Sequence, residues 1–549
     1  MARTALVDLL RQAYQVYLIS TKTGMPKDEV MDLRLSRRQV LGGMAATLAV
    51  SAKQRGGLGL LPTRSEGIST GGSTGGSVSG SVDGSGVLIV GAGIAGLTAA
   101  YRLQQSGVRV DVVEASRRVG GRLRSLRNVV GNPGVVEMGG EFIDTRHTAV
   151  RSLATELGLE LADLRLADTG LEPEVLFFQG HRVSQRRVIE EFAPLAKRIA
   201  DDLQTLGDRP ISYHHPSEAA VRLDRLSIAE YLEKTPISPV LDQLLKVAYV
   251  TEFGRDAESQ SCLNMLFLIG AEVGKWSTYG ISDERYHVVG GNDQIPQRLA
   301  KRLHGEIETG TVLESIRAKP DGRYQVSLQQ GSTSVERIYE RILVTVPFGV
   351  LRQIELAIDL PPVKRRAIAE LGYGTSTKLS VPFQERIWRS RYNSTISVYS
   401  DLDFQNTWES ARYGVGSSGW LTNLRGGTNG MALGEGNLKD QTQKLLSDFE
   451  GIFPGISAAQ QGKVVRSFWA AEPYSLGSYA CYLPGQWTAI GGAEGERVGN
   501  IWFAGEHCSP GSQGYMNGAC ETAEIAARSI LQDLGVPVGI SGSTESGIK

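Results

Sequence analysis

The clearest pattern of hydrophobic and polar positions in this chain begins at Val87. Four apolar residues, Val87–Val90, have the length and continuity expected of a buried parallel strand. A glycine-rich turn follows, and the stretch Ile94–Gln105 predicts a helix that Gly107 ends. A second apolar run, from Val110 to Val113, predicts a second strand. The pattern therefore predicts a strand–helix–strand unit of the α/β class.

Three glycines in this turn have the spacing GxGxxG. Gly91 allows a tight turn, Gly93 lets a pyrophosphate approach the backbone, and Gly96 lets the helix pack on the strand. The first helical residues, Ala95 among them, would direct their backbone amides at that pyrophosphate. Glu114 ends the second strand about 20 residues after the turn, where an acid binds a ribose hydroxyl pair. Together these features predict a dinucleotide-binding site.

The same kind of pattern returns later in the chain. A mainly helical section runs from about residue 188 to residue 274. It is followed by a predicted helix at 294–303, a strand at 306–313 and a buried strand at 341–346. A last buried strand precedes Gly505, and a final helix is predicted at 519–531. The α/β unit is therefore interrupted by insertions.

Composition limits the classes of partner. Of the 549 residues, 41% are hydrophobic and 21% charged, and the net charge of −1 gives no basic excess that would indicate a nucleic acid. No apolar stretch approaches about eighteen residues, so no transmembrane segment is predicted. The four cysteines lack CxxC spacing, so neither a metal site nor a disulfide framework is predicted.

The N-terminal part differs in composition from the rest. The pair Arg37-Arg38 precedes a mildly apolar segment that ends in small residues near Ala52. This arrangement predicts a Tat export signal in residues 1–52 and a periplasmic or extracellular location. The alternative is a chance arginine pair in a cytoplasmic protein. Residues 53–85 are rich in Gly and Ser and predict a flexible linker.

The segment after Glu114, EASRRVGGR, resembles the FAD-dependent amine oxidases. In that family a glycine pair and flanking arginines continue the pyrophosphate site. The resemblance implies that Arg118, Gly121 and Arg122 bind FAD. A plain Gly-Gly turn with solvated arginines is the alternative.

Four more segments match the family, in the family's order along the chain. One contains the pair Gly139-Gly140 and corresponds to a turn near the flavin ring in the family. Another contains Val312 and corresponds to a strand whose backbone reaches the adenine. The other two segments surround Trp469 and Glu506, in the C-terminal part of the chain. The further FAD-binding residues that the resemblance implies are Gly139, Gly140, Glu141, Phe142, Val312, Trp469, Glu506 and Met516.

The resemblance also implies three catalytic side chains. Lys378 matches a lysine that holds a water beside the flavin N5 atom, and Tyr479 and Tyr515 match the aromatic cage of the monoamine oxidases. The alternatives are a strand-end lysine and ordinary core aromatics. Ser478 stands where the monoamine oxidases carry the cysteine that binds the flavin covalently, so we expect FAD to be bound non-covalently.

The implied architecture is a Rossmann-like FAD-binding domain interleaved with an α+β substrate-binding domain. The FAD-binding domain is expected to comprise residues 86–150, 280–347 and 480–535. The substrate-binding domain, with its helical insertion, is expected to comprise residues 151–279 and 348–479. Residues 536–549 are expected to form a flexible tail.

The function implied by the resemblance is oxidation of a primary or secondary amine by hydride transfer to FAD. The expected products are an imine, then an aldehyde, and hydrogen peroxide from dioxygen. L-amino acid oxidases, the alternative, usually place a carboxylate-binding arginine two residues after the Gly-Gly pair. Phe142 occupies that place, although Arg146 or an arginine of the insertion could substitute. More distant alternatives are a lipid desaturase or isomerase and an inactive FAD-bound scaffold; we also expect a homodimer.

Overall fold

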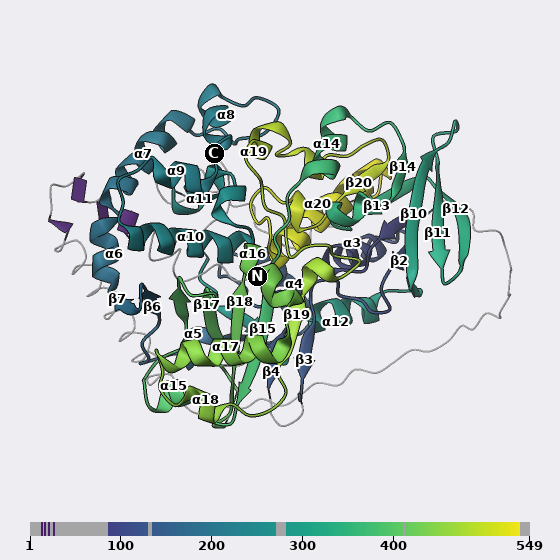
Figure 1. The fold of residues 1–549 in the computed structure, drawn as a ribbon. Coiled ribbons are helices and arrows are strands. Elements are labelled where there is room, and N and C mark those ends of the chain that lie inside the picture. The colour runs from purple at the N-terminus through teal and green to yellow at the C-terminus, as the bar shows by residue number, and fades with distance from the viewer. Residues whose placement is uncertain are drawn as a thin grey trace, which may run out of the picture. The chain divides into compact units, whose positions relative to one another are not determined.

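A computed structural model describes residues 86–537, except 130–133, 271–281, 411 and 415, and a few mostly helical residues between 13 and 27. The described residues from 86 onward belong to one compact unit (Figure 1). The twin arginines, the Gly/Ser-rich segment and the chain after residue 537 lie outside the described residues. The predictions made for those segments therefore stay predictions.

A five-stranded parallel sheet follows from the strand–helix–strand pattern. Its order is β20-β13-β1-β2-β9, and every neighbouring pair is parallel. The strands are β1 (Val87–Val90), β2 (Val110–Glu114), β9 (Ile307–Thr309), β13 (Arg341–Val344) and β20 (Ile501–Phe503). Because parallel strands end at the same edge, turns from distant parts of the chain meet there. All five strands come from the segments expected to form the FAD-binding domain.

Helices from three parts of the chain share the main core with this sheet. The helices are α3 (Ile94–Gln105), α4 (Thr148–Glu156), α12 (Gln294–Arg302) and α20 (Met516–Asp533). Helix α3 begins and ends as its pattern predicts, whereas α20 begins three residues before the predicted start at 519. The strand predicted at 306–313 is split, because Gly310 adopts a φ of 69° between β9 and β10.

A seven-stranded sheet forms the second large layer. Its order is β19-β15-β18-β17-β16-β6-β7, antiparallel except between β16 and β6. The strands are β6 (Val175–Phe178), β7 (His181–Val183), β15 (Thr377–Phe383), β16 (Val398–Ser400), β17 (Asn406–Ser410), β18 (Gly419–Arg425) and β19 (Val465–Phe468). Helix α17 (Leu438–Glu450) crosses its front in Figure 1 and contributes to a separate apolar core. These strands all come from the segments expected to form the substrate-binding domain.

A four-stranded sheet of order β12-β11-β10-β14 stands at the edge of the unit (Figure 1). Its strands are β10 (Thr311–Ala318), β11 (Tyr324–Gln330), β12 (Thr333–Tyr339) and β14 (Glu355–Ala357). Strands β11 and β12 are antiparallel neighbours and form a hairpin. Strand β14 lies beyond residue 347, in a segment expected to belong to the substrate-binding domain. It pairs with β10 of the expected FAD-binding domain, so this sheet contains strands from both expected domains.

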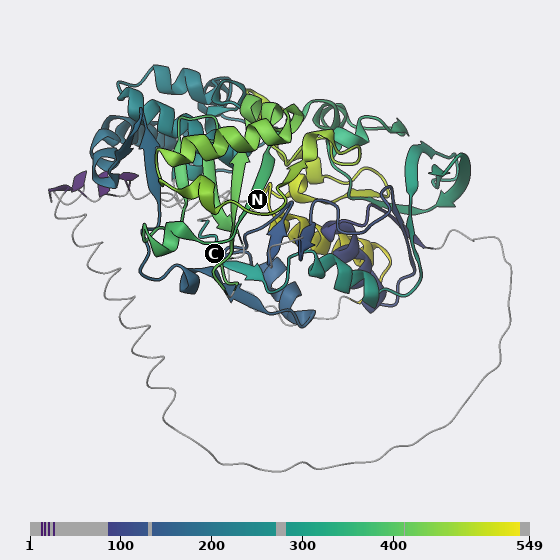
Figure 2. The same cartoon turned by 60° about the horizontal axis from the view of Figure 1, so that its bottom comes forward.

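The section predicted to be helical from about residue 188 to residue 274 forms a group of helices as far as it is described. They are α6 (Gln185–Glu191), α7 (Ala193–Leu206), α8 (Glu218–Asp224), α9 (Ile228–Glu233), α10 (Pro239–Phe253) and α11 (Cys262–Gly270). Helix α10 contacts β6, β16 and β18, and Figure 2 shows the group beside the seven-stranded sheet. This contact brings the C-terminal end of α10 toward the site described below.

Short elements complete the described chain. The short strands, which form two small sheets, are β3 (Ser125–Arg127), β4 (Val135–Glu137), β5 (Leu161–Asp163) and β8 (Tyr286–Val288). The remaining helices are α5 (Leu164–Ala167), α13 (Phe348–Leu351), α14 (Pro362–Glu370), α15 (Ile387–Ser390), α16 (Gly427–Glu435), α18 (Ile456–Ala459) and α19 (Gln486–Ala489).

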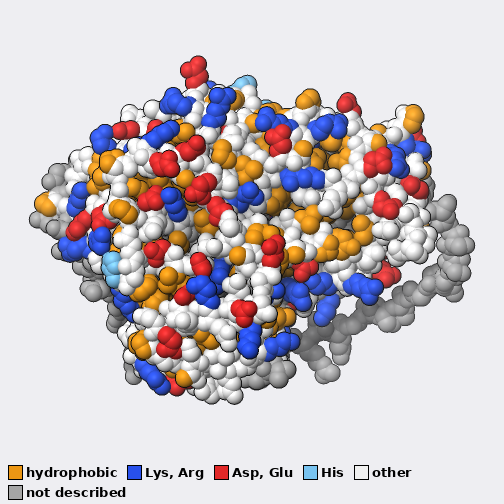
Figure 3. Space-filling model, in the orientation of Figure 1, with side chains coloured by type: hydrophobic (Ala, Val, Ile, Leu, Met, Phe, Trp, Pro, Cys, Tyr) orange, Lys and Arg blue, Asp and Glu red, His pale blue; other side chains and the backbone are white. Residues whose placement is uncertain are grey.

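Membrane-spanning helices and metal-binding clusters are absent from the described residues. Within this part of the chain, no helix combines the length and apolarity needed to cross a membrane. The described His, Cys, Asp and Glu side chains form no group of three suited to a metal ion. All four cysteines are buried free thiols. On the face seen in Figure 3, acidic and basic side chains are interspersed.

Candidate active site

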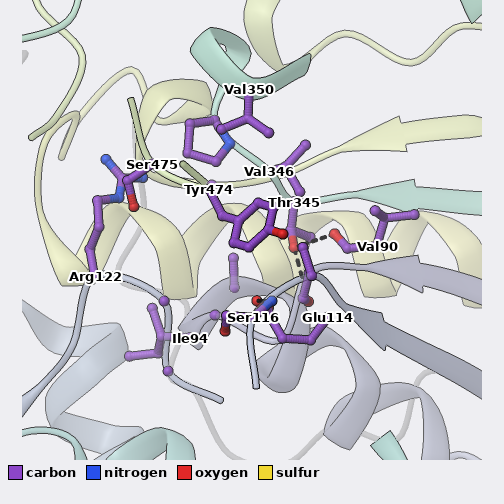
Figure 4. A pocket seen from close by; sticks show the side chains of 18 of the residues that line it. Val90, Ile94, Glu114, Ser116, Arg122, Thr345, Val346, Val350, Tyr474 and Ser475 are labelled. Atoms are coloured by element: carbon purple, nitrogen blue, oxygen red, sulfur yellow. Dashed lines mark hydrogen bonds between the residues drawn. The ribbon is translucent and has the colours of Figure 1, made fainter. Parts of the chain in front are cut away.

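A cavity of about 470 Å³ lies at the carboxyl edge of the parallel sheet. Figure 4 shows Arg122 on one side of it and Glu114 and Thr345 together on the other. Of the residues expected to bind FAD, those that line it are Gly91, Gly93, Ala95, Glu114, Arg118, Gly121, Arg122, Gly140, Val312, Trp469, Glu506 and Met516. The position fits the rule that open α/β sheets bind ligands outside the carboxyl ends of their strands.

The glycine turn has the shape that a dinucleotide requires. Gly91 adopts a φ of 103°, and a Cβ built at Gly96 would lie 1.9 Å from the carbonyl oxygen of Gly91. Gly96 therefore serves helix packing and does not line the cavity. A Cβ at Gly93 would meet nothing within 4 Å, because this residue faces the cavity. The open space over Gly93, at the N-terminus of α3, fits a pyrophosphate.

Glu114 is fixed at the end of β2 by the backbone. Its Oε2 accepts a hydrogen bond from the Ala92 amide at 2.7 Å, and its Oε1 accepts one from the Ser116 amide at 2.9 Å. The carboxylate is thus oriented before any ligand binds. Each oxygen keeps a lone pair that a ribose hydroxyl can use.

The two arginines of the glycine-pair segment have different roles. The Arg118 guanidinium donates to the carbonyls of Val119, Gly121 and Leu123, so it holds its own loop in shape. Burial and the neighbouring positive charge of Arg124 lower the pKa of Arg118 below its ordinary value. Arg122 instead reaches across the cavity wall to another motif.

Glu506 joins three segments at the cavity. It forms an ion pair of 2.8 Å with Arg122, and its oxygens accept hydrogen bonds from the Ala480 and Gly514 amides. The next side chain, His507, is buried. Its pKa is lowered to about 3, mainly by burial and also by the positive charges of Arg122 and Lys364. His507 is therefore neutral at ordinary pH and is not a strong base here.

A second, smaller cavity of about 30 Å³ adjoins the first and shares three lining residues with it: Arg122, Gly140 and Trp469. Lys378, Tyr479 and Gly139 line the smaller cavity, and Tyr515 lines the larger one. The structure thus brings all three expected catalytic side chains to the same end of the cofactor cavity.

The two tyrosines are anchored on consecutive residues of α10. The Tyr479 hydroxyl donates to the carbonyl oxygen of Thr251 at 3.3 Å and accepts from Ser376 at 3.1 Å. The Tyr515 hydroxyl donates to Glu252 Oε1 at 3.2 Å. Burial raises the pKa of Tyr479 well above its ordinary value, so this phenol stays neutral. Both rings are held in fixed positions beside the cavity.

Glu141 and Phe142 lie outside the lining of both cavities. Phe142 packs edge-on against Trp408 at 5.7 Å between ring centroids. Glu141 turns toward Lys378 and forms an ion pair of 2.8 Å with it. Their expected contacts with FAD therefore do not appear in the cavity lining, although they lie next to residues that do.

Several residues at the site escaped the sequence analysis. Thr345 follows β13 directly and lines the main cavity, which its place after a buried strand could have indicated. Glu252 accepts a hydrogen bond from the Tyr515 hydroxyl, and the ring of His147 packs against the Tyr515 ring. Only the folded chain brings these residues together. Arg412 lies over the Phe142 ring at 5.3 Å, whereas Arg146 is exposed.

Known proteins resemble this chain over most of its length. The family model described as flavin containing amine oxidoreductase matches residues 94–531. An L-amino acid dehydrogenase of Synechocystis is 26% identical over 464 residues, which cover 81% of this chain and 94% of that protein. Flavin-containing amine oxidase B of Sus scrofa is 26% identical over 464 residues, covering 82% and 86%.

Solved structures share the fold. Cyclohexylamine oxidase from Brevibacterium oxydans matches with a TM-score of 0.70 at 23% identity, covering 82% of this chain and 100% of that one. Wild-type putrescine oxidase bound to putrescine matches with a TM-score of 0.69 at 20% identity, covering 81% and 99%. The expected mixed α/β fold is confirmed.

Proposed function

Because the chain belongs to the flavin-containing amine oxidoreductase family, we propose that it binds FAD and uses it to oxidise an amine to an imine. The observation that carries this proposal is the pair of adjoining cavities. One has the glycine turn and acid of a dinucleotide site, and the other has a lysine beside a buried tyrosine, with the second tyrosine nearby.

The proposed cofactor is held at both of its ends. Glu114 would bind the adenosine ribose, the amides of the Gly93 turn would bind the pyrophosphate, and Val312 would lie at the adenine. Trp469, Gly140 and Met516 would surround the ring system where the two cavities meet. FAD supplies the hydride acceptor for the C–H bond next to the amine nitrogen.

The side chains of this chain prepare the amine. Tyr479 and Tyr515 are 3% and 5% exposed, so they offer two apolar ring faces that can flank the nitrogen and align its neighbouring carbon. An apolar setting lowers the pKa of an ammonium group and favours the neutral amine, whose lone pair is needed for oxidation. The imine product then hydrolyses in water to an aldehyde or ketone and an amine or ammonia.

Attachment of the cofactor is proposed to be non-covalent. Ser478 occupies the place expected for a cysteine, and its hydroxyl lies 3.3 Å from that of Ser376. The nearest cysteine in sequence, Cys481, is fully buried, and its pKa is raised by that burial, so it is a poor nucleophile. With dioxygen as the second substrate, the reduced cofactor would yield hydrogen peroxide.

A substrate panel tests the proposed function. The purified holoenzyme is mixed without oxygen with primary, secondary and aliphatic diamines and with basic and aromatic L-amino acids, and loss of the oxidised flavin absorbance is followed. Rapid bleaching by at least one class of amine supports the proposal. Purification without flavin, or photoreducible flavin that no amine or amino acid bleaches, would contradict it.

One observation favours an L-amino acid as a second candidate substrate. The Arg412 guanidinium lies over the ring of Phe142, which takes the sequence position of the carboxylate-binding arginine of that class, although neither residue lines the two cavities. Its partner is Asp168, at 2.8 Å. A relative of this chain carries the name L-amino acid dehydrogenase. Both candidates use the same hydride chemistry, but only the L-amino acid has a carboxylate that a side chain must bind.

Replacing Arg412 separates the two candidates. Arg412→Met is expected to raise KM for an L-amino acid at least tenfold and to leave KM for a simple amine unchanged. Arg389→Met is the matched control, because Arg389 pairs with the same Asp168 at 2.9 Å. Equal effects of both variants would show that only the shared ion pair matters and would remove the amino-acid candidate.

Export and assembly are also proposed, from the sequence. The pair Arg37-Arg38 would direct the folded holoprotein through the Tat pathway. Replacing both arginines by lysine should hold the protein in the cytoplasm of the producing cell, as cell fractionation would reveal. The proposed homodimer would be detected by light scattering of the purified protein.

A further inference from the structure

Lys378, which lines the small cavity, belongs to a buried ion pair. Lys378 Nζ lies 2.8 Å from Glu141 Oε2, and the two side chains are 8% and 4% exposed. The pair joins the start of β15 to the turn that follows β4. A buried charge of either sign is costly by itself, so each partner depends on the other.

The ammonium group of Lys378 has its donors engaged by the protein. Besides Glu141, it donates to the carbonyl oxygens of Gly139 at 2.8 Å and Glu137 at 3.3 Å. An ammonium group has three N–H donors, and these three acceptors match them in number. The geometry thus directs the lysine toward the turn at 137–141 instead of toward a water in the cavity.

Glu141 is held in its charged form. Its second oxygen accepts hydrogen bonds from Trp408 Nε1 at 2.9 Å and from Ser410 at 3.1 Å. Burial alone would raise the pKa of Glu141, but the charge and hydrogen bond of Lys378, with the Trp408 donor, bring it below its ordinary value. The positive charge beside the small cavity is therefore balanced by a negative charge in direct contact.

This balance bears on the choice of electron acceptor. Dioxygen takes two electrons and two protons to become hydrogen peroxide, one proton coming from flavin N5 and one from solvent. Its first electron creates a small, concentrated negative charge that a nearby unpaired cation stabilises. The field of an ion pair falls off faster than that of a single charge, so the paired Lys378 gives little of this help.

We propose that Glu141 is a positioning residue that neutralises Lys378 and so holds back the reaction of the reduced cofactor with dioxygen, in favour of a quinone-type acceptor. A quinone takes the same two electrons and two protons to become a hydroquinone. It spreads the intermediate charge over a ring and does not need the cation. This inference rests on the proposed FAD chemistry.

The test measures reoxidation without using an amine. Holoenzyme reduced by light is mixed with air-saturated buffer or with dichlorophenolindophenol, a quinone-type dye, and the return of oxidised flavin absorbance is followed. Glu141→Gln should raise the rate with dioxygen at least tenfold and change the rate with the dye less than threefold. An unchanged ratio of the two rates would overturn the proposal.

A second variant decides the matter independently of the first. Lys378→Met leaves the Glu141 carboxylate without its cation, so the ratio of the dioxygen rate to the dye rate should fall below that of the wild type, and a rise would overturn the proposal. In the double variant Glu141→Gln/Lys378→Met, the gain in the dioxygen rate should disappear. If Glu141→Gln does not fold, the double variant decides, because it removes both charges: a tenfold fall in its ratio of dioxygen rate to dye rate below the wild type would show that Lys378 itself assists dioxygen and would overturn the proposal.

The reduction potential of the bound flavin supplies a readout other than rate. Glu141→Gln leaves an unbalanced cation and should shift the potential to a more positive value, measured against a reference dye. The matched control is Glu409→Gln on β17, which removes another buried carboxylate to which a tryptophan donates. Equal shifts in both variants would overturn the proposal. Failure of the proposed function would instead appear as absence of flavin.

Discussion

Arg122 Nη1 lies 2.8 Å from Glu506 Oε1, which joins two motifs that are 384 positions apart in the chain. The pair forms part of the wall shared by the glycine-pair loop and the turn after β20. Because Glu506 also accepts the Gly514 amide, it orients the start of α20 toward the cofactor cavity. One carboxylate thus sets the relative positions of three segments at the cavity.

Glu506→Gln should weaken FAD binding at least tenfold, because Arg122 loses its charged partner while the side-chain shape is kept. The dissociation constant is measured from the fluorescence of released FAD. Arg102→Met is the control, since Arg102 pairs with Glu156 and Glu524 away from both cavities. Equal FAD affinity in the wild type and Glu506→Gln would contradict the role assigned to this carboxylate.

The two glycines of the turn should respond differently to alanine. Gly96→Ala places a Cβ 1.9 Å from the Gly91 oxygen and should lower the free energy of unfolding by about 2 kcal/mol or more. Gly93→Ala has an ordinary φ of −72° and open space, so its stability without cofactor should be unchanged while FAD affinity falls. Thermal unfolding of the apoprotein measures stability, and titration with FAD measures affinity. A Gly93→Ala apoprotein that is less stable than the wild type would contradict the prediction for Gly93.

Replacement of the tyrosines separates ring from hydroxyl. Tyr515→Phe loses the hydrogen bond to α10, and Tyr479→Phe loses its bond to α10 and the one from Ser376. Both variants keep the ring and should keep the rate of flavin reduction within about tenfold. The corresponding alanine variants lose the ring faces that align the amine and should lose about 100-fold or more. Stopped-flow reduction without oxygen gives these rates. Alanine variants as fast as the phenylalanine variants would rule out an aligning role.

Lys364 should make stability depend on alkaline pH. This lysine is fully buried. Burial lowers its pKa from 10.5 to about 8, although Cys508, Glu494 and Glu496 act to raise it. Between these values the unfolded chain binds more protons than the folded protein, so stability should rise with pH from about 8 to 10.5.

Lys364→Met should remove that rise and stabilise the protein at pH 7 by on the order of 2 kcal/mol. Urea unfolding at a series of pH values provides the measurement. Lys301, which is exposed, is the control, and the alkaline rise should persist in Lys301→Met. A profile that keeps its alkaline rise in Lys364→Met would contradict the assignment.

Non-covalent attachment predicts a simple result on denaturation. Precipitation of the holoenzyme with acid should leave all of the flavin in the yellow supernatant, because Ser478 offers no thiol. The absorbance of supernatant and dissolved pellet at the flavin maximum gives the distribution. A yellow pellet would show a covalent bond and would direct attention to a residue other than Ser478.

Local signals in the sequence were enough for part of this protein. The apolar run at Val87, the glycine spacing and Glu114 all act through neighbours in the chain, and β1, α3 and β2 form as predicted. The split of one predicted strand at Gly310 was not foreseen, because a single glycine gives no sign of whether it will adopt a positive φ. Within the cofactor site, most expected residues line the cavity.

The sequence by itself determined the nucleotide turn, the α/β class and the order of the segments that meet at the cavity, since hydrophobic period and glycine spacing are local properties. The tertiary structure alone decided that Glu141 pairs with Lys378, that Arg412 lies over Phe142, and that the tyrosines bond to α10. These contacts join residues far apart in the chain. Their energies depend on burial and direction, which only the packed fold supplies.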